Sequence, residues 1–278
     1  MTQLDVFNPF SAAVYHEDIV GSTMDISHSL ALQGEAHGTV ITADFQEAGR
    51  GRIRDRNWHS QNGENLLFTI LLRYPRIEEI PSALTLKAGL AVALAIGDFM
   101  PDLAGRVKLK WPNDVMITFS GKFSHNGTSY LRYVDTKDTE FIKKVCGIYT
   151  EAEGGIVHLG IGVNFGQKEF PESIQNKATS ISLASGMEIA KSQRFILLEK
   201  ILLRLHELIE KKETQQNRQM QINNMLFKKG EQISFAEGAV GSGKIVNGIL
   251  DGIGPGGELL IIPDGEKEAR AFVTGELV

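Results

Sequence analysis

Short runs of β-branched and apolar residues recur along this chain and are separated by stretches with helical periodicity. Strand-like runs lie at residues 39–46, 65–72, 107–111, 114–118, 146–151 and 156–164. Apolar residues repeat at helical spacing over 81–98, where Pro101 follows as a stop, and over 194–212. Strands interrupted by separate helices predict an α+β fold, with helices packed on a mixed or antiparallel sheet.

The character of the chain changes after the polar stretch 211–224. From 231 to 278 the sequence consists of short alternating segments punctuated by glycine, which predicts a small C-terminal SH3-like β-barrel. We place the boundary near Leu226, so the expected domains are 1–225 and 226–278. Residues 238–245 resemble a phosphate-binding P-loop, but Ile245 stands where a serine or threonine is needed and a strand-like pattern follows. We expect a glycine turn in a hairpin there.

Composition narrows the class of protein. The chain has 278 residues, 42% hydrophobic and 23% charged, as in ordinary soluble globular proteins. Its 29 Lys and Arg against 34 Asp and Glu leave a net charge of −5, which argues against a nucleic-acid-binding role. The most apolar helix-like stretch, 86–96, contains Lys87 and is too short to cross a membrane.

Other features point to the cytoplasm. We see no secretory signal at the N-terminus. The single cysteine, Cys146, lies in an apolar run and is expected to be a buried small hydrophobe, compatible with a reducing compartment. The seven histidines are scattered, without the spacing of a zinc site.

Residues 46–58 read Q-E-A-G-R-G-R-I-R-D-R-N-W and carry the most information. Arginines at 50, 52, 54 and 56 alternate with other residues, and two glycines allow backbone geometries that other residues resist. Forked guanidinium groups suit phosphates, so this loop is expected to wrap a polyanionic ligand. A solvated basic loop is the alternative, since charge runs are usually exposed surface.

Three further motifs accompany this loop: G-S-T-M at 21–24, K-W-P-N-D at 110–114, and K-V-C-G-I-Y-T-E at 144–151 with G-I-G-V-N at 160–164. In this order the set resembles biotin protein ligase over nearly the whole chain, in a form that lacks the N-terminal DNA-binding domain. One extra residue precedes Trp58, so Arg54 or Arg56 takes the third arginine's role, and spacing favours Arg56. Between Asp114 and Lys144 lie 29 residues, more than the family usually has, which we interpret as an extended hairpin or a disordered excursion.

The resemblance implies ATP-dependent activation of biotin to biotinyl-5′-AMP and transfer of biotin to a lysine of a biotin carboxyl carrier protein. The implied catalytic residues are Arg50, Arg52 and Lys144. The implied biotin contacts are Ser22, Thr23, Gln46, Gly49, Arg50, Trp58, Lys144 and Gly147. The implied ATP contacts are Arg52, Arg56, Lys110, Asn113, Gly160, Gly162 and Asn164, and Asp114 is the candidate ligand for Mg2+.

Two other functions stay open. A lipoate or octanoate ligase shares the catalytic fold, but its acid has an apolar far end and less need for the polar set Ser22, Thr23 and Gln46. A non-catalytic biotin or nucleotide sensor would tolerate loss of Lys144 and the arginines, all of which are present. Apart from a carrier protein we expect no nucleic-acid or membrane partner. The sequence leaves both a monomer and a sheet-to-sheet homodimer open, and it does not assign a role to the C-terminal barrel.

Overall fold

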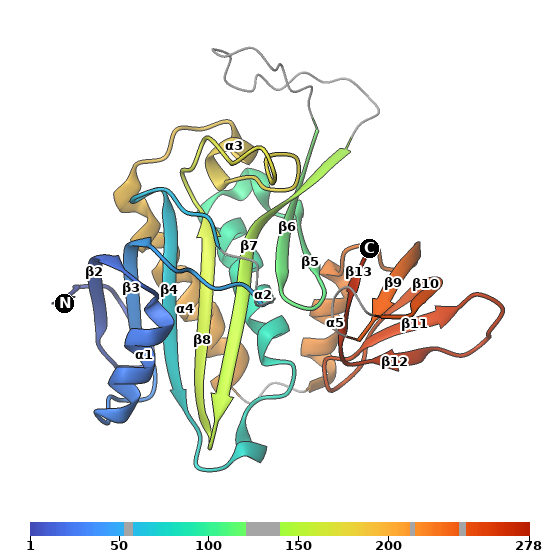
Figure 1. Cartoon of the computed structure of the whole chain (residues 1–278), viewed down its shortest axis with the longest axis horizontal. Coiled ribbons are helices and arrows are strands. Elements are labelled where there is room, and N and C mark those ends of the chain that lie inside the picture. Colours follow the sequence, from blue (N-terminus) through green and yellow to red (C-terminus); the bar gives the residue numbers. More distant parts are fainter. Residues whose placement is uncertain (53–57, 121–139, 212–214, 239–242) are drawn as a thin grey trace.

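The fold is built on a mixed eight-stranded sheet with strand order β1-β2-β3-β4-β8-β7-β6-β5 (Figure 1). The computed structural model describes residues 1–52, 58–120, 140–211, 215–238 and 243–278. The parallel pair is β2 with β3, and the other neighbours in this sheet pair antiparallel. The strands are β1 (Thr2–Gln3), β2 (Val14–Val20), β3 (Thr39–Gln46), β4 (Asn65–Arg73), β5 (Val107–Lys110), β6 (Asp114–Ser120), β7 (Glu140–Glu153) and β8 (Ile156–Asn164).

Helices cover both faces of this sheet. Helix α1 (Thr23–Leu32) packs on β3, β4 and β8, and α2 (Leu84–Phe99) and α4 (Arg194–Glu210) pack together on the opposite face (Figure 1). Helix α4 buries one apolar stripe, including Leu198, Ile201 and Leu205, as its periodicity predicts. The remaining helical elements are α3 (Ile181–Ser185), α5 (Gln215–Met225) and the 3-10 helices Ile77–Glu79, Pro101–Leu103 and Lys191–Gln193.

The apolar segment Ile77–Phe99 passes a length and composition test for a membrane span. However, 61% of its most apolar window is buried inside the structure. Residues such as Leu90, Ala91 and Ile96 of α2 are fully buried and belong to the main hydrophobic core. Burial of this extent is typical of a helix in the hydrophobic core of a globular protein.

Central strand β4 shows why this sheet forms. Its first eight residues, 65–72, are all buried, as expected for a strand covered on both faces. The neighbouring hairpin β7–β8 turns at Gly154 and Gly155, with φ angles of +55° and +85°. Two consecutive residues with positive φ match the twist of paired strands, and glycine adopts them without strain.

The C-terminal residues form a second, antiparallel sheet with order β12-β11-β10-β9-β13. Its strands are β9 (Gln232–Glu237), β10 (Ile245–Ile253), β11 (Leu259–Pro263), β12 (Arg270–Phe272) and β13 (Gly275–Leu277). This sheet is consistent with an SH3-like domain, but among the described residues β12 and β13 remain edges, so the barrel is not closed. The prediction that residues 238–245 do not form a P-loop is confirmed, because Ile245 lies in β10 and pairs with Ala236 of β9 in a β-hairpin.

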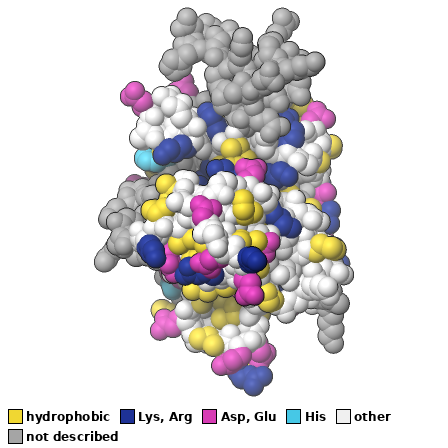
Figure 2. Space-filling model, turned by 90° about the vertical axis from the view of Figure 1, so that its right-hand side faces the viewer, with side chains coloured by type: hydrophobic (Ala, Val, Ile, Leu, Met, Phe, Trp, Pro, Cys, Tyr) yellow, Lys and Arg dark blue, Asp and Glu magenta, His cyan; other side chains and the backbone are white. Residues whose placement is uncertain are grey.

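The C-terminal sheet shares a core with the main sheet. Trp111 follows β5, and its ring centroid lies 5.9 Å from that of Phe235, while its indole N–H donates to the Gly257 carbonyl at 3.0 Å. The predicted boundary near Leu226 stays a prediction. On the face that the C-terminal sheet presents, acidic, basic and hydrophobic side chains are intermingled (Figure 2).

Several elements were not assigned from the sequence, among them β1, β2, α3 and α5. Strand β1 has two residues, and β2 has a polar centre, H-E-D, that hides its strand character. Helix α5 is polar on most sides and buries only Arg218 and Ile222. Strand β7 begins at Glu140, six residues before the predicted start, and pairs with β6 up to Ser120. The long insertion therefore begins and ends as an antiparallel pair, and 121–139 lie outside the described residues.

Candidate active site

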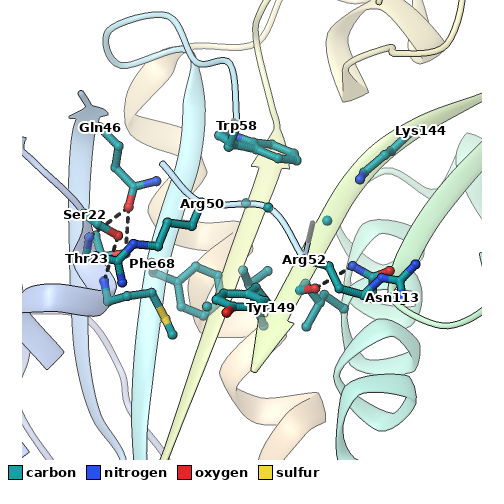
Figure 3. A pocket seen from close by; sticks show the side chains of 17 residues that line it. Ser22, Thr23, Gln46, Arg50, Arg52, Trp58, Phe68, Asn113, Lys144 and Tyr149 are labelled. Carbon is teal, nitrogen blue, oxygen red and sulfur yellow. Dashed lines mark hydrogen bonds between the residues drawn. The ribbon is translucent and has the colours of Figure 1, made fainter. Parts of the chain in front are cut away.

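A cavity opens on the face of the main sheet that α1 covers (Figure 3). Its walls come from the start of α1, the end of β3, residues 50–52 and Trp58, and strands β4, β7 and β8. It is lined by Ser22, Thr23, Met24, Gln46, Arg50, Gly51, Arg52, Trp58, Phe68, Asn113, Lys144, Gly147, Ile148, Tyr149, Gly160, Ile161 and Gly162. Eleven of these residues are among those expected from the sequence to form the site. Distant motifs therefore meet in one place.

One end of the cavity is polar and rigid. Ser22 caps α1, and its hydroxyl accepts the Met24 backbone N–H at 3.3 Å. The Gln46 side-chain oxygen accepts the Thr23 backbone N–H at 2.8 Å and lies 3.0 Å from the Thr23 hydroxyl. That hydroxyl also lies 2.8 Å from the hydroxyl of Thr69 on β4. Ser22 and Thr23 are buried, so these groups are held in place by the helix start and two strands.

An indole ring lies across a glycine floor in the middle of the cavity. A Cβ atom on Gly162 would come within 2.8 Å of the Trp58 ring, and one on Gly147 within 3.0 Å of both Trp58 and Lys144. The Trp58 backbone N–H donates to the Gly49 carbonyl at 2.9 Å, which fixes the base of the ring. Glycine is required at these strand positions because the ring occupies the space of a side chain. Phe68, Ile148 and Ile161 supply further apolar wall.

Positive charge lies at both ends of the cavity: Figure 3 shows Arg50 beside Ser22 and Thr23, and Arg52 and Lys144 at the opposite end. The Arg50 guanidinium donates to Asp25 Oδ1 at 2.6 Å and lies 3.9 Å from Glu151 Oε1. Arg52 donates to the Gly275 carbonyl in the C-terminal sheet at 3.2 Å. Cationic groups at the mouth of a partly apolar cavity suit a ligand with an anionic end. The other two predicted loop arginines, Arg54 and Arg56, lie outside the described residues.

Lys144 and Asp114 form an ion pair beside the cavity. Lys144 Nζ lies 2.6 Å from Asp114 Oδ1 and 5.7 Å from the centroid of the Trp58 ring. The Lys144 backbone is bonded on both sides, to Lys177 and Thr179. Neighbouring Asn113 donates its amide to the Ile148 carbonyl at 2.8 Å and so fixes the K-W-P-N-D turn.

The candidate magnesium ligand is therefore a carboxylate already paired with a lysine. None of the described lining residues is acidic, so Asp114 is the nearest acidic group from the predicted set. Mg2+ commonly takes one or two carboxylates and completes its shell with phosphates and water. With Asp114 as the one nearby carboxylate of the predicted set, the site fits a magnesium ion whose ligands are mainly phosphate oxygens and water. It does not fit an ion coordinated by protein side chains alone.

Some expected site residues lie apart from the cavity lining. Asn164 is buried in a hydrogen-bond network, where it accepts from Asn65 at 3.1 Å and donates to the Thr179 carbonyl at 2.9 Å. Lys110 ends β5 and pairs in register with Asp114. Gly49 lies behind the lining, against Gln46 and Trp58. These residues shape the surroundings of the cavity.

Several lining or adjacent residues escaped the sequence analysis. Tyr149 lines the cavity, and Asp25 and Glu151 pair with Arg50. One signal was available for two of them, because alternate residues of a strand share a face, so Gly147 predicts Tyr149 and Glu151 beside it. Asp25 has no comparable signal, since its contact depends on how α1 meets the loop.

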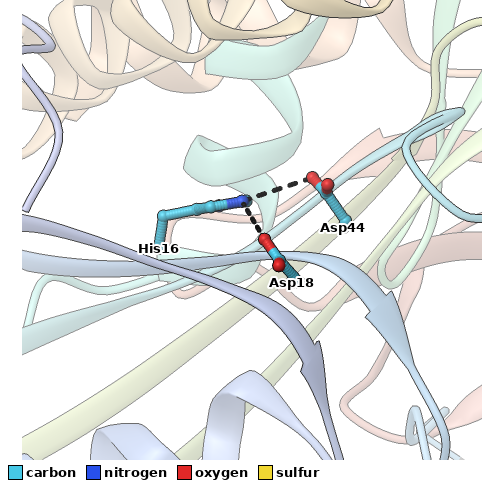
Figure 4. Close-up of side chains that lie close together, drawn as sticks. All are labelled: His16, Asp18 and Asp44. Carbon is cyan, nitrogen blue, oxygen red and sulfur yellow. Dashed lines mark ion pairs between the residues drawn. The ribbon is translucent and has the colours of Figure 1, made fainter. Parts of the chain in front are cut away.

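A second group of polar side chains, His16, Asp18 and Asp44, lies on β2 and β3 (Figure 4). His16 Nε2 lies 3.4 Å from Asp44 Oδ1 and 3.8 Å from Asp18 Oδ1. Asp44 also forms an ion pair with Arg194, which stacks over Phe195 at the start of α4. Because Asp44 already forms an ion pair with Arg194, we interpret His16, Asp18 and Asp44 as a structural contact between the sheet and α4.

The comparisons with known proteins agree with this geometry. A model of the biotin/lipoate A/B protein ligase family matches residues 18–164, more than half of the chain. The chain belongs to this family. The matched segment includes every residue that lines the cavity, whereas Gly275, the partner of Arg52, lies beyond it.

Individual members of the family show the same likeness. The chain is 33% identical over 187 residues to the bifunctional ligase/repressor BirA of Bacillus subtilis, covering 64% of this chain and 49% of that protein. It is 29% identical over 166 residues to the biotin--[acetyl-CoA-carboxylase] ligase of Mycobacterium tuberculosis, covering 58% and 52%. The chain thus spans about half the length of the curated relatives it matches.

The fold extends the likeness to nearly the whole chain. A biotin protein ligase from Aquifex aeolicus, solved in complex with biotin and ATP, has 26% sequence identity and a TM-score of 0.68. The match covers 95% of this chain and 97% of that one. The C-terminal sheet is therefore part of the shared architecture.

Proposed function

We propose that this protein activates biotin with ATP to biotinyl-5′-AMP and transfers biotin to a lysine of a biotin carboxyl carrier protein. The observation that carries the proposal is the order of groups along the cavity: buried polar side chains at one end, apolar side chains in the middle, and Arg52 with Lys144 at the other end (Figure 3). Biotin has the same order of groups: a ureido ring, an apolar thiophane and valeryl chain, and a carboxylate. The names of the relatives and the biotin and ATP bound to the Aquifex protein support it.

The polar end is assigned to the ureido ring. Ser22, Thr23 and Gln46 offer hydroxyl and amide groups that both donate and accept, as a cyclic urea requires. These groups are fixed by bonds to one another, so they need little reordering on binding. Trp58 and Phe68 would pack on the apolar part of the ligand.

The cationic end is assigned to the first half-reaction. The biotin carboxylate attacks the α-phosphorus of ATP, an acyl-phosphate bond forms, and the bond to pyrophosphate breaks. Negative charge gathers where two anions meet, so Arg52 and Lys144, which lie at this end, are proposed to stabilise it, whereas Arg50 lies beside Ser22 and Thr23 and is a weaker expectation for this role. Asn113, Gly160 and Gly162 are proposed to border the adenosine, and Arg56, Lys110 and Asn164 remain weaker expectations for this end.

Magnesium is proposed as a charge-neutralising ion on the ATP phosphates. Asp114 would contribute one carboxylate oxygen, and Lys144 would then turn from Asp114 toward the ligand. The role of Lys144 is to hold the ligand oxygens while the leaving pyrophosphate departs.

In the second half-reaction the carrier lysine attacks the acyl carbon of biotinyl-5′-AMP. An amide forms, the bond to AMP breaks, and the lysine proton is lost. The Trp58 ring and residues 49–52 are proposed to keep water from the mixed anhydride until the carrier docks. We propose a cytoplasmic location, in keeping with a single free, buried cysteine, and leave a monomer and a homodimer as alternative assemblies.

The rival substrate is lipoate, which the description of the family names beside biotin, or the similar acid octanoate. An apolar acid would leave Ser22, Thr23 and Gln46 without ligand partners in a buried place, which is unfavourable. Incubating the protein with ATP labelled at the α-phosphate, Mg2+ and either biotin or lipoate separates the possibilities. We expect labelled acyl-adenylate with biotin. Adenylate with lipoate alone would show the rival substrate, and ligand binding without any adenylate would show a sensor.

A further inference from the structure

Residues 177–179 hold the backbone of Lys144, the lysine at the cationic end of the cavity. Strand β8 runs beside β7 and ends at Asn164. Beyond that end, the Lys144 N–H donates to the Lys177 carbonyl at 2.8 Å, and the Thr179 N–H donates to the Lys144 carbonyl at 2.9 Å. These two bonds, the Lys144 brace, form a short parallel bridge that continues the sheet beside β7 where β8 stops.

The side chain of Asn164 joins the end of β8 to the Lys144 brace. Its amide nitrogen donates to the Thr179 carbonyl at 2.9 Å, and its oxygen accepts from the Asn65 amide at 3.1 Å. Asn65, on β4, also donates to the Gln167 side-chain oxygen at 2.9 Å. All four of these residues are at most 3% exposed. Loss of one donor from such a network leaves an acceptor unpaired in the core, so the network is rigid.

Both polar atoms of the Asn164 side chain are thus used inside the protein. The Thr179 carbonyl can only accept, so the amide nitrogen of Asn164 must face it, and the amide oxygen then faces Asn65. Lys144, in contrast, lines the cavity. This arrangement suits a residue that acts on the site through its neighbours and does not suit a side chain that binds the ligand.

The Lys144 side chain depends on where its backbone is held. It is 33% exposed, and its ammonium group lies 2.6 Å from Asp114. Under the proposed function Lys144 leaves Asp114 for the ligand oxygens, so this ion pair no longer holds it when its charge has to be in place. A lysine carries its charge on a flexible four-carbon stem, and the position of the backbone then sets what the charge can reach.

We propose that Asn164 is a positioning residue that acts on adenylate formation through the Lys144 brace, in place of the side-chain contact with ATP that the resemblance implies. This rests on the proposed function, which assigns Lys144 to the reacting anions. Asn65 serves the same purpose, because it fixes the Asn164 amide in the orientation that donates to Thr179. A charge that stabilises a transition state loses much of its effect when it is displaced slightly.

The kinetic test measures biotinyl-5′-AMP formation by rapid quench in Asn164→Ala, Lys144→Ala and the double variant. With biotin and ATP saturating, we expect Asn164→Ala to lower the rate about tenfold, as for a displaced preorganised charge. The KM for ATP should change less than about twofold, because no ATP contact is lost. When Lys144 is already alanine, adding Asn164→Ala should change the rate less than about twofold, because its effect passes through Lys144.

Ser182→Ala is the matched control for a general loss of stability. Ser182 is buried, and its hydroxyl donates to the Met187 carbonyl at 2.6 Å, a side-chain hydrogen bond outside the Lys144 brace. Both single variants should lower the Tm, since each leaves a carbonyl without its donor. Only Asn164→Ala should slow adenylate formation, and an equal slowing in Ser182→Ala would overturn the proposal.

Amide hydrogen exchange tests the Lys144 brace without using the reaction. The Lys144 and Thr179 amides donate its two hydrogen bonds, so both should exchange about tenfold faster in Asn164→Ala. Their exchange in Ser182→Ala should match that of the unchanged protein. Unchanged exchange at both amides in Asn164→Ala would show that Asn164 does not support the brace and would overturn the proposal.

The kinetic outcomes separate this proposal from the proposed function. The unchanged protein is assayed for biotinyl-5′-AMP in parallel, and if it makes none, the proposed function fails. If it makes the adenylate, three results overturn only the positioning role: a wild-type rate in Asn164→Ala, a raised KM for ATP at that rate, or an effect that persists in the Lys144→Ala background.

Discussion

The two ends of the cavity are built by different means. At the polar end, Ser22, Thr23 and Gln46 sit on regular elements and bond to one another and to Thr69. At the cationic end, Arg52 comes from a loop and is held by a backbone carbonyl of the C-terminal sheet, and Lys144 is held by the Asp114 carboxylate. The first end is preorganised for a neutral group, and the second has partners that a stronger anion can displace.

This difference suits the two tasks of an acyl-adenylating enzyme. Recognition of a small neutral ring needs fixed donors and acceptors, since each unpaired buried polar group is unfavourable. Phosphate chemistry needs charge that gathers as the reactants arrive and relaxes as products leave. Variants at each end should therefore alter different kinetic quantities.

The largest effect is expected at the cationic end. Arg52→Ala should slow the formation of biotinyl-5′-AMP by ~10²-fold or more, the scale of losing one preorganised donor to a transition state. Equilibrium binding of biotin alone should change little, because Arg52 is assigned to the phosphates. Rapid-quench measurement of adenylate formation checks this, and a wild-type rate would remove Arg52 from the mechanism.

A smaller effect of another kind is expected at the polar end. Gln46→Leu leaves Thr23 without its acceptor and removes the amide from the ureido position, so biotin affinity should fall about 10- to 100-fold. Once biotin is saturating, the turnover number should stay within a few-fold of the original. Competition binding with lipoate serves as the control, and an equal loss of affinity for both acids would contradict the assignment.

The smallest effect concerns the contact of His158 with helix α1 and depends on pH. Burial, together with the neighbouring His28, lowers the pKa of His158 from 6.5 to about 4. The unfolded chain therefore binds a proton here at a higher pH than the folded chain, and stability falls as pH drops from about 6.5 to about 4. His158→Gln should reduce the fall in Tm over this window by about 2–4 °C. Calorimetric scans at pH 7, 5.5 and 4.5 check the difference, and identical pH profiles would exclude His158 as a contributor.

Local patterns predicted much of the fold and most of the cavity. Strand β8 and helices α2 and α4 follow from runs of apolar residues whose period matches the element. The elements that were missed, β2 and α5, bury little apolar surface of their own and take their shape from the neighbours they pack against. Local patterns also led us to expect a closed C-terminal barrel, because the pattern of a strand does not indicate which strand pairs with each of its edges.

The sequence by itself determined which chemical groups are present: arginines next to glycines, a carboxylate after a proline turn, a lysine at the start of an apolar run, and a serine placed to cap a helix. Those properties are local, because they depend on residue type and on spacing within one element. Only the tertiary structure decided which group each charged side chain contacts. Arg50 pairs with Asp25, which is 25 residues away in the sequence, and Arg52 donates to Gly275, which is 223 residues away. Such meetings result from how whole elements pack, and no short pattern along the chain encodes them.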